Sequence, residues 1–422
     1  MPEQPMPFVI EIPTQEVARI KVVGVGGGGG NALNNMIRQG IKGVEFIAVN
    51  TDRQDLDGNL APAKVQIGRL LTRGLGAGSK PEIGRQAAEE SIEELERVLE
   101  GADMVFLAAG MGGGTGTGAT PIIGGVARRL GILTVAVVTM PYEDEGPARM
   151  RKALAGIQAL APQVDTLIVI PNQRLMELAE EREDLTLEQA FLLADQVLYN
   201  AVKGIAEVIT VRGVINLDFA DVRTVLENGG AALIGSSTAT GPNRAEEAIY
   251  GALRHPMMNG RTIAGARHVL VNITAGTPPL MREIRTILGV LNREAQDVQE
   301  ILHGVIVDEE VGEQLRVTVL ATGFAEPLLE ALAAPHTRRP NLAPASAPMA
   351  ESDRVVESSL PERSSRSTAP DEERAPLSRP LEEPAIDRRR ADPKVVRLSS
   401  DSGKPSAEQD LGLPTLLRRI MD

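Results

Sequence analysis

Residues 110–118 of this sequence, GMGGGTGTG, have the composition of a phosphate-binding loop. They follow an apolar run at 103–109, expected to form a buried strand, and they precede Pro121, a proline suited to the first turn of a helix. A loop between a strand and a helix directs unpaired backbone N–H groups and the positive end of the helix dipole toward an anion. Thr115 and Thr117 add hydroxyl donors. We therefore predict a phosphate cradle here rather than a flexible surface turn.

Two further glycine-rich stretches have the same character. Residues 26–30, GGGGG, lie between an expected strand at 20–25 and a helix that opens at Asn31. Residues 72–78, TRGLGAG, precede Pro81 and a charged amphipathic helix, and their backbone N–H groups suit a terminal phosphate. Together with the first loop, they predict a site for the phosphate chain of a nucleotide.

These glycine motifs alone leave the nucleotide class open. Residues 24–29, GVGGGG, match the dinucleotide fingerprint, and Asp52 follows the next strand, so a nicotinamide dehydrogenase is an alternative. Against it, the glycine run continues into Asn31, and the chain also carries the richer loop at 110–118. The sequence has no GxxxxGKS/T motif, which excludes a P-loop nucleotidase.

A group of carboxylates suggests the chemistry. Asn216, Asp218 and Asp221 lie within residues 213–222, GVINLDFADV, at the expected start of a helix. Two carboxylates and an amide in one loop can orient and polarise a water that attacks a phosphate. One of the aspartates can also serve only as the N-cap of the helix. We take the three residues as candidate catalytic groups.

A possible base-binding pair lies on a long helix expected at 185–211. Phe191 and Asp195 are four residues apart and so share one face of it. A ring that stacks on a base, beside a carboxylate that accepts two N–H donors, suits the N1 and N2 edge of guanine, whereas adenine lacks such a pair of donors. The alternative is a core phenylalanine and a solvated aspartate, and the glycine loops favour the guanine interpretation.

The elements that must position these residues follow an α/β pattern from Arg19 onward. Short β-branched strands alternate with helices, which predicts a mostly parallel sheet covered on both faces. Ligands bind such sheets at the carboxyl ends of the strands, where the glycine loops, Asn50 to Asp52 and Asn172 can converge. Strands are expected at 20–25, 45–50, 103–109, 133–138 and 166–170.

The long helix joins this part to a smaller α+β unit. If the helix runs antiparallel to the strands, the loop at 213–222 lies on the side opposite the nucleotide, where it can serve only a neighbouring copy stacked head to tail. Such a heterologous contact produces filaments. In the smaller unit we expect helices at 222–227, 243–253 and 281–295 and strands at 231–234, 268–273, 304–307 and 315–320.

Composition excludes several classes of function. The formal net charge of −13 argues against nucleic acid as a main partner, and the absence of cysteine excludes disulfides, thiol catalysis and cysteine-based zinc sites. The four histidines show no paired metal spacing, so no protein metal site is expected. No apolar stretch is long enough for a membrane span, and the N-terminus has no signal pattern, which predicts a cytoplasmic protein without direct membrane insertion.

We divide the chain into five segments. Residues 325–409 are rich in Pro, Ser, Arg, Glu and Ala and have too little apolar surface to fold, so we expect a disordered linker. The last residues regain apolar character, which is typical of a docking peptide, although a frayed end without a role is the alternative. The segments are a flexible arm at 1–17, the nucleotide-binding α/β domain with the central helix at 18–212, the catalytic loop and α+β domain at 213–324, the linker at 325–409 and the docking peptide at 410–422.

At residues 18–324 the sequence resembles the FtsZ family of bacterial tubulin homologues, which assemble into the cell-division ring. The resemblance implies a tubulin/FtsZ-like fold and a GTPase whose site forms between subunits of a protofilament, with GTP or GDP bound and Mg²⁺ on the phosphates. The motifs are GVGGGGGN at 24–31, NTD at 50–52, LGAG at 75–78, GGGTGTG at 112–118, PN at 171–172 and NLDFAD at 216–221.

The resemblance also implies roles for single residues. Glu145 and Arg149 fall where the family contacts ribose and phosphate, and Asp218 and Asp221 match the carboxylates supplied to the neighbouring subunit. The chain departs from the family at Lys80, where asparagine is usual. The candidate nucleotide-binding residues are Gly27, Gly28, Gly29, Asn31, Asn50, Asp52, Ala77, Gly78, Gly112, Gly113, Gly114, Thr115, Gly116, Thr117, Glu145, Arg149, Asn172, Phe191 and Asp195.

Partners and location follow from the same resemblance. It implies self-assembly into head-to-tail filaments, assembly-activated GTP hydrolysis, a place in the mid-cell ring, and contacts with membrane-tethering and regulatory division proteins through the C-terminal peptide. The alternative is a paralogue that forms filaments outside the main division ring and hydrolyses GTP weakly.

Overall fold

The computed structural model describes residues 18–179, 186–258, 263–295 and 298–324, which belong to one compact unit of the chain. The expected arm at 1–17, linker at 325–409 and docking peptide at 410–422 lie outside the described residues. None of the helices in the described ranges is long and apolar enough to cross a membrane.

The described strands form a 10-stranded sheet in the order β3-β2-β1-β4-β5-β6-β7-β10-β8-β9. All neighbours from β3 to β7 are parallel, β10 is antiparallel to both β7 and β8, and β8 is parallel to β9. The predicted fold class, a mostly parallel α/β part joined to a smaller α+β part, is confirmed. The strands are β1 (Ile20–Val25), β2 (Val44–Asn50), β3 (Ala63–Gln66), β4 (Met104–Gly110), β5 (Leu133–Met140), β6 (Thr166–Pro171), β7 (Gly230–Ala239), β8 (His268–Ala275), β9 (Glu300–Val307) and β10 (Leu315–Thr322).

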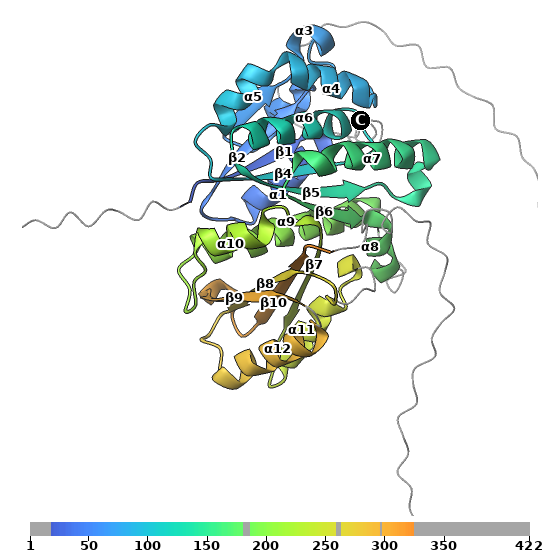
Figure 1. Ribbon diagram of the computed structural model, residues 1–422. Helices are drawn as coiled ribbons and strands as arrows, with labels where there is room; N and C mark the ends of the chain where they lie inside the picture. Colours follow the sequence, from blue (N-terminus) through green and yellow to red (C-terminus); the bar gives the residue numbers. More distant parts are fainter. Residues whose placement is uncertain (1–17, 180–185, 259–262, 296–297, 325–422) are drawn as a thin grey trace, which may run out of the picture. The chain divides into compact units, whose positions relative to one another are not determined.

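Helices cover both faces of the parallel strands (Figure 1). In β1, Val23 and Val25 belong to the apolar core that includes α5, α6 and α7, whereas Ile20 and Val22 belong to the core that includes α1, α9 and α10. The helices are α1 (Gly26–Arg38), α2 (Arg53–Gly58), α3 (Arg69–Thr72), α4 (Pro81–Glu90), α5 (Ile92–Leu99), α6 (Thr115–Arg129), α7 (Pro147–Leu160), α8 (Asn172–Ala179), α9 (Leu187–Thr210), α10 (Phe219–Leu226), α11 (Arg244–Leu253) and α12 (Met281–Glu294).

The long helix α9 lies between the parallel strands and the strands β7 to β10 (Figure 1). A capping box starts it: the Gln189 backbone N–H donates to the Thr186 hydroxyl, and the Thr186 N–H donates to the Gln189 side chain. Its far end is followed by Gly213, where an added Cβ would clash with the carbonyl oxygen of Val305 in β9. The glycine therefore lets the chain after α9 pack directly on the C-terminal strands.

Two predicted helix starts are wrong. Helix α1 begins at Gly26, not at Asn31, and α6 begins at Thr115, so Pro121 lies inside that helix rather than in its first turn. Glycine has a low helix propensity, which by itself favours a loop at both stretches. The glycines are in the helices because the backbones approach closely: an added Cβ on Gly29 would clash with the Ala108 carbonyl oxygen. The short strand β3 was not predicted.

Candidate functional site

The loops after the parallel strands meet at one edge of the sheet, called the rim below. Val25 of β1 is level with Val49 of β2 and with Ala109 of β4. Met140 of β5 is level with Pro171 of β6. The strand order reverses between β1 and β4, and the helices after these two strands lie on opposite faces. Such a switch point is where open α/β sheets bind their ligands.

The N-termini of α1 and α6 meet at this switch point. An added Cβ on Gly26 would lie 2.8 Å from the backbone nitrogen of Gly116. The N-cap residues are Val25 and Gly114, and within the described ranges no side chain caps either helix. Two uncapped helix N-termini place first-turn N–H groups and positive dipole ends in one place, which suits a phosphate chain.

The glycine-threonine stretch forms a buried turn that leads into α6. Gly112 has φ +102°, and its N–H donates to the Thr117 hydroxyl at 2.8 Å. That hydroxyl keeps its own proton for donation. The Thr115 hydroxyl pairs at 2.6 Å with that of Thr51, which follows β2. The two threonines therefore brace the turn as well as offering hydroxyl groups.

The glycine stretch at 72–78 and the residues after it lie against the stretch at 110–118. An added Cβ on Gly114 would be 2.8 Å from Ala77 Cβ, 3.2 Å from the Ser79 nitrogen and 3.0 Å from the Lys80 nitrogen. Ala77 is buried, whereas the neighbouring Gly78 is exposed. The structure thus brings the predicted terminal-phosphate loop onto the N-cap of α6.

The end of β2 contributes polar side chains to the rim. The Asp52 carboxylate accepts from the backbone of Gln54 and Asp55 and caps α2. Asn50 donates its side-chain N–H to Asp55 at 3.3 Å. The Asp55 carboxylate also lies 3.4 Å from an added Cβ on Gly27. Asp55 was not predicted as a site residue: in the sequence, its position three residues after Asp52 points to it, whereas its place beside Gly27 follows from the fold.

On the other side of the glycine turn, Arg149 of α7 lies over Gly112. Its Cγ would be 2.7 Å from an added Cβ on that glycine. The guanidinium also forms an ion pair with Glu145 at 3.0 Å. The pair is a cation and an anion at the edge of the phosphate cradle, the arrangement that suits a phosphate and a ribose hydroxyl.

An aromatic pair continues the rim toward α9. The rings of Tyr142 and Phe191 meet edge to face, with centroids 5.8 Å apart and planes at 70°. The Tyr142 hydroxyl donates to the Ala190 carbonyl oxygen at 3.0 Å. Burial, together with the Glu145 and Asp195 carboxylates, raises the pKa of Tyr142 to about 12, so the phenol stays neutral. Phe191 is 39% exposed and can stack on a base. Tyr142 was not predicted as a site residue.

Asn172 and Asn31 complete this group. Asn172 directly follows β6 and is 6% exposed, and its side-chain oxygen has no hydrogen-bond partner among the described residues. An unpaired buried amide oxygen is unfavourable, so its position favours a ligand donor there. Asn31 is half-buried on α1, just after the glycines.

The three candidate catalytic residues lie elsewhere, and all three are exposed. The Asn216 side-chain oxygen accepts from the Gly213 N–H at 2.6 Å. Asp218 is the N-cap residue of α10, but its side chain makes no cap hydrogen bond, and Asp221 lies in the first turn. The simple N-cap interpretation therefore does not account for the Asp218 carboxylate.

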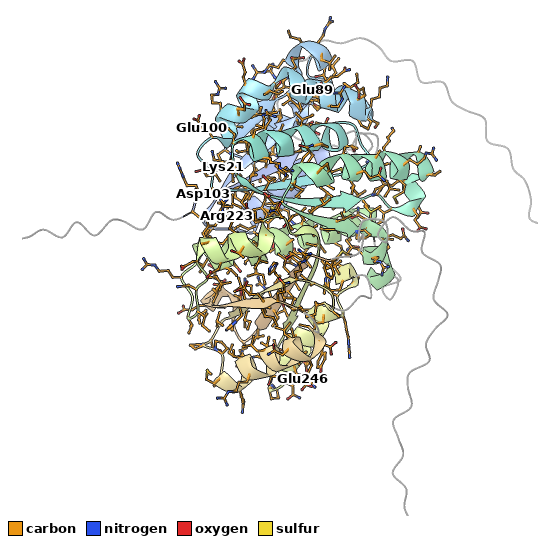
Figure 2. All side chains as sticks on the ribbon, viewed as in Figure 1. Lys21, Glu89, Glu100, Asp103, Arg223 and Glu246 are labelled. Atoms are coloured by element: carbon orange, nitrogen blue, oxygen red, sulfur yellow. The ribbon has the colours of Figure 1, made fainter. Side chains whose placement is uncertain are left out.

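The direction of α9 separates these residues from the rim. Near its start, Ala190 touches Tyr142, which follows the carboxyl end of β5. At its end, Thr210 lies 2.6 Å from an added Cβ on Gly43, directly before β2. A helix rises 1.5 Å per residue, so these points are about 30 Å apart. Figure 2 shows Arg223 of α10 on the same side of the view as Asp103. Asp103 directly precedes β4 and so lies at the end of that strand opposite the rim.

Metal ligands do not gather in the described part of the chain: no group of three or more His, Asp or Glu side chains there could hold an ion. A site of this composition fits a cation held mainly by the phosphates of a ligand, as is common for Mg²⁺.

Comparison with known proteins agrees with this geometry. Residues 19–180 match the model of the Tubulin/FtsZ family, GTPase domain, and residues 230–325 match that of the FtsZ family, C-terminal domain. The chain is 50% identical over 309 residues to the cell division protein FtsZ of Pseudomonas aeruginosa, covering 73% of this chain and 78% of that protein.

Solved structures show the same similarity. An empty FtsZ dimer from M. jannaschii matches with a TM-score of 0.68 and 42% identity over 72% of this chain and 88% of that one. A GTPγS-bound protofilament of CetZ2 from Haloferax volcanii matches with a TM-score of 0.61 over 75% of this chain and 96% of that one. At 21% identity, the match to CetZ2 shows a common fold and nothing beyond it.

Proposed function

Because this chain belongs to the FtsZ family and carries the tubulin-like GTPase domain, we propose that it binds GTP at the rim, polymerises head to tail and hydrolyses GTP between neighbouring subunits. The separation of about 30 Å along α9 carries the proposal, because a helix of that length keeps Asp218 and Asp221 away from the rim of their own subunit.

In this proposal the glycine stretches hold the phosphates. The N-termini of α1 and α6 take the inner phosphates, and the loop that contains Ala77 and Gly78 takes the terminal one. Phe191 stacks on guanine, and Asp195 accepts from its N1 and N2 donors. The loop at 72–78 adds a place for a terminal phosphate. A triphosphate has such a group and a nicotinamide dinucleotide does not, so the arrangement favours GTP.

Mg²⁺ fits the donor set at the rim. The Asp52 and Asp55 carboxylates and the Asn50 amide lie beside the phosphate cradle, and such oxygen donors suit the ion when phosphates supply the other ligands. When bound, the ion neutralises negative charge on the phosphates.

The exposed carboxylates of one subunit would complete the site of the next. The Asp218 side chain makes no cap hydrogen bond, so its oxygens can accept from another group, and Asp221 lies in the first turn of the same helix. The Asn216 side chain is held by the hydrogen bond that it accepts from the Gly213 N–H. Placed over the terminal phosphate of a neighbour, the two carboxylates accept hydrogen bonds from a water and orient it for in-line attack.

Exposed apolar side chains at the rim and beside the C-terminal end of α9 support head-to-tail contact. Near the rim, Leu70 is 84% exposed and Leu75 is 82% exposed. At the other end, Val214 and Met281 are each 68% exposed. Val214 donates its N–H to Val305 of β9, and Met281 follows the neighbouring strand β8, so both lie at one end of the C-terminal strands. Stacking would bury both patches.

We extend the proposal to the cell by analogy with the curated relative, whose name is cell division protein FtsZ. The filament would form the division ring at mid-cell in the cytoplasm, and the segment at 410–422 would bind membrane-tethering and regulatory division proteins. The net charge of −13 argues against nucleic acid as a partner.

A mixing experiment tests the shared site. Asp221→Ala, which lacks one of the proposed catalytic carboxylates, is mixed with Asp195→Ala, which is expected to lose guanine binding but keeps its carboxylates, and GTP turnover is measured beside pelleting. If each site needs the carboxylates of a neighbour, an equimolar mixture should recover about a quarter of the wild-type turnover, because about a quarter of the contacts pair the intact nucleotide site of Asp221→Ala with the intact carboxylates of Asp195→Ala.

The matched control is Glu227→Ala, which removes an exposed carboxylate from the other end of α10. On its own it should turn GTP over as wild type does. A mixture of Asp221→Ala and Asp195→Ala that pellets but stays as inactive as each variant alone would show that each subunit completes its own site and would refute the proposal.

A further inference from the structure

Lys152 of α7 reaches across the glycine turn and holds the loop before α4. Its ammonium group donates to the Ser79 carbonyl oxygen at 2.7 Å, and the bond is partly buried. Arg149 lies three residues earlier on α7 and so on the same face, over Gly112. One face of α7 therefore contacts both the glycine turn and the third phosphate loop.

The held segment has an unusual backbone. Gly78 has φ +55° and Ser79 has φ +56°, so two successive residues are left-handed. This region is unfavourable for a residue with a Cβ, such as Ser79. The hydrogen bond from Lys152 is charge-assisted and stabilises the carbonyl orientation that this conformation requires. The Ser79 nitrogen then lies 3.2 Å from an added Cβ on Gly114.

We propose that Lys152 is a positioning residue that holds the segment at 77–80 closed on the N-cap of α6, and that it thereby sets the preference for a nucleoside triphosphate over a diphosphate. The inference rests on the proposed function, in which this segment contacts only the terminal phosphate. The inner phosphates and the base lie against α1, α6 and α9, which Lys152 does not hold.

The test compares Lys152→Met with Lys152→Arg and with Arg151→Met. Arg151 is an exposed cation on the same helix, so its removal is a control for charge alone. Affinities for GDP and for the slowly hydrolysed analogue GTPγS are measured at protein concentrations below assembly. Loss of one charge-assisted hydrogen bond should weaken GTPγS binding by Lys152→Met about tenfold. GDP binding should change less than about twofold, and Lys152→Arg should retain most of the preference.

Hydrogen exchange of the nucleotide-free proteins tests the contact itself. Amides of residues 78–80 should exchange faster in Lys152→Met than in wild type or Arg151→Met, with no change in α6. Equal weakening of both nucleotides, or unchanged exchange at 78–80, would overturn the role of Lys152. A wild-type protein that binds neither nucleotide would instead refute the proposed function, and this inference with it, while the exchange data would still report on the contact.

Discussion

Single polar atoms at the rim show where a ligand is needed. Thr115 and Thr117 are engaged with Thr51 and Gly112, so most hydroxyl groups of the cradle have partners within the protein. The side-chain oxygen of Asn172 has none in the described ranges, although the residue is 6% exposed. The threonine hydroxyl groups thus help to hold the rim in shape, whereas the Asn172 oxygen is placed to meet a ligand.

Asn172→Leu should weaken nucleotide binding without weakening the fold. The side-chain oxygen has no hydrogen bond to lose in the nucleotide-free protein, and burying an unpaired oxygen is unfavourable, so the free energy of unfolding should change by less than about 1 kcal/mol. Loss of the bond to the ligand should raise the dissociation constant for GDP about tenfold. Calorimetric titration and urea unfolding measure the two quantities.

Thr166→Val is a useful comparison for this variant. The Thr166 hydroxyl is buried and donates to the Leu226 carbonyl oxygen. Its removal should lower the unfolding free energy by about 1 kcal/mol and leave GDP binding unchanged. If Asn172→Leu behaved in the same way, its side chain would have a structural role only.

Close packing between elements explains why helices begin inside the glycine stretches. Helix α4 packs on α6 so tightly that an added Cβ on Gly118 would clash with the Pro81 carbonyl oxygen and lie 2.6 Å from the Arg85 nitrogen. Because α4 follows the third phosphate loop, this contact also sets the distance of that loop from the cradle. The glycines of α6 therefore determine the dimensions of the site.

Gly118→Ala should destabilise the protein by about 2 kcal/mol, because a methyl group must be placed against backbone atoms that cannot move independently. Gly125→Ala, in the same helix, is the matched control. Its added Cβ would be 3.0 Å from the end of the Gln163 side chain, which can turn away. There the higher helix propensity of alanine should leave stability unchanged or raise it by about 0.5 kcal/mol. Urea unfolding of both variants is the measurement, and equal effects would contradict the packing argument.

The whole molecule has two functional ends joined by α9. Its N-terminal part lies at the rim beside Tyr142, and its C-terminal end leads to the exposed carboxylates of the loop before α10. Apolar side chains are exposed at both ends. Under the proposed function, each end of the molecule would carry one half of the hydrolytic site, and turnover should therefore follow assembly.

Met281→Asp should raise the concentration at which filaments pellet about tenfold, because it removes apolar contact and adds a charge at the end that would stack on a neighbour. The threshold in GTP turnover should move to the same concentration, while GTP affinity below the threshold stays unchanged. Thr286→Asp places the same charge on another exposed position of α12 and should leave both thresholds in place. A turnover threshold that did not move with pelleting would argue against assembly-linked hydrolysis.

Local pattern alone was enough for the α/β class, most strands and the long helix. The predicted strands became β1, β2 and β4 to β10, because short apolar runs rich in β-branched residues and bounded by turn residues favour buried strands. Motif order was enough to identify the family, since each motif is short and contiguous. Neither kind of signal depends on which segments touch in space.

The tertiary structure decided what spacing cannot encode. Helix starts at Gly26 and Thr115 depend on backbones that meet across the sheet, and a glycine in a sequence does not show whether it bends a loop or admits a neighbour. The roles of Asp55, Tyr142 and Lys152 depend on contacts between residues distant in the chain or on the fold around them. The distance between the rim and Asp221 likewise follows from the direction of α9, which is a property of packing and not of the order of residues.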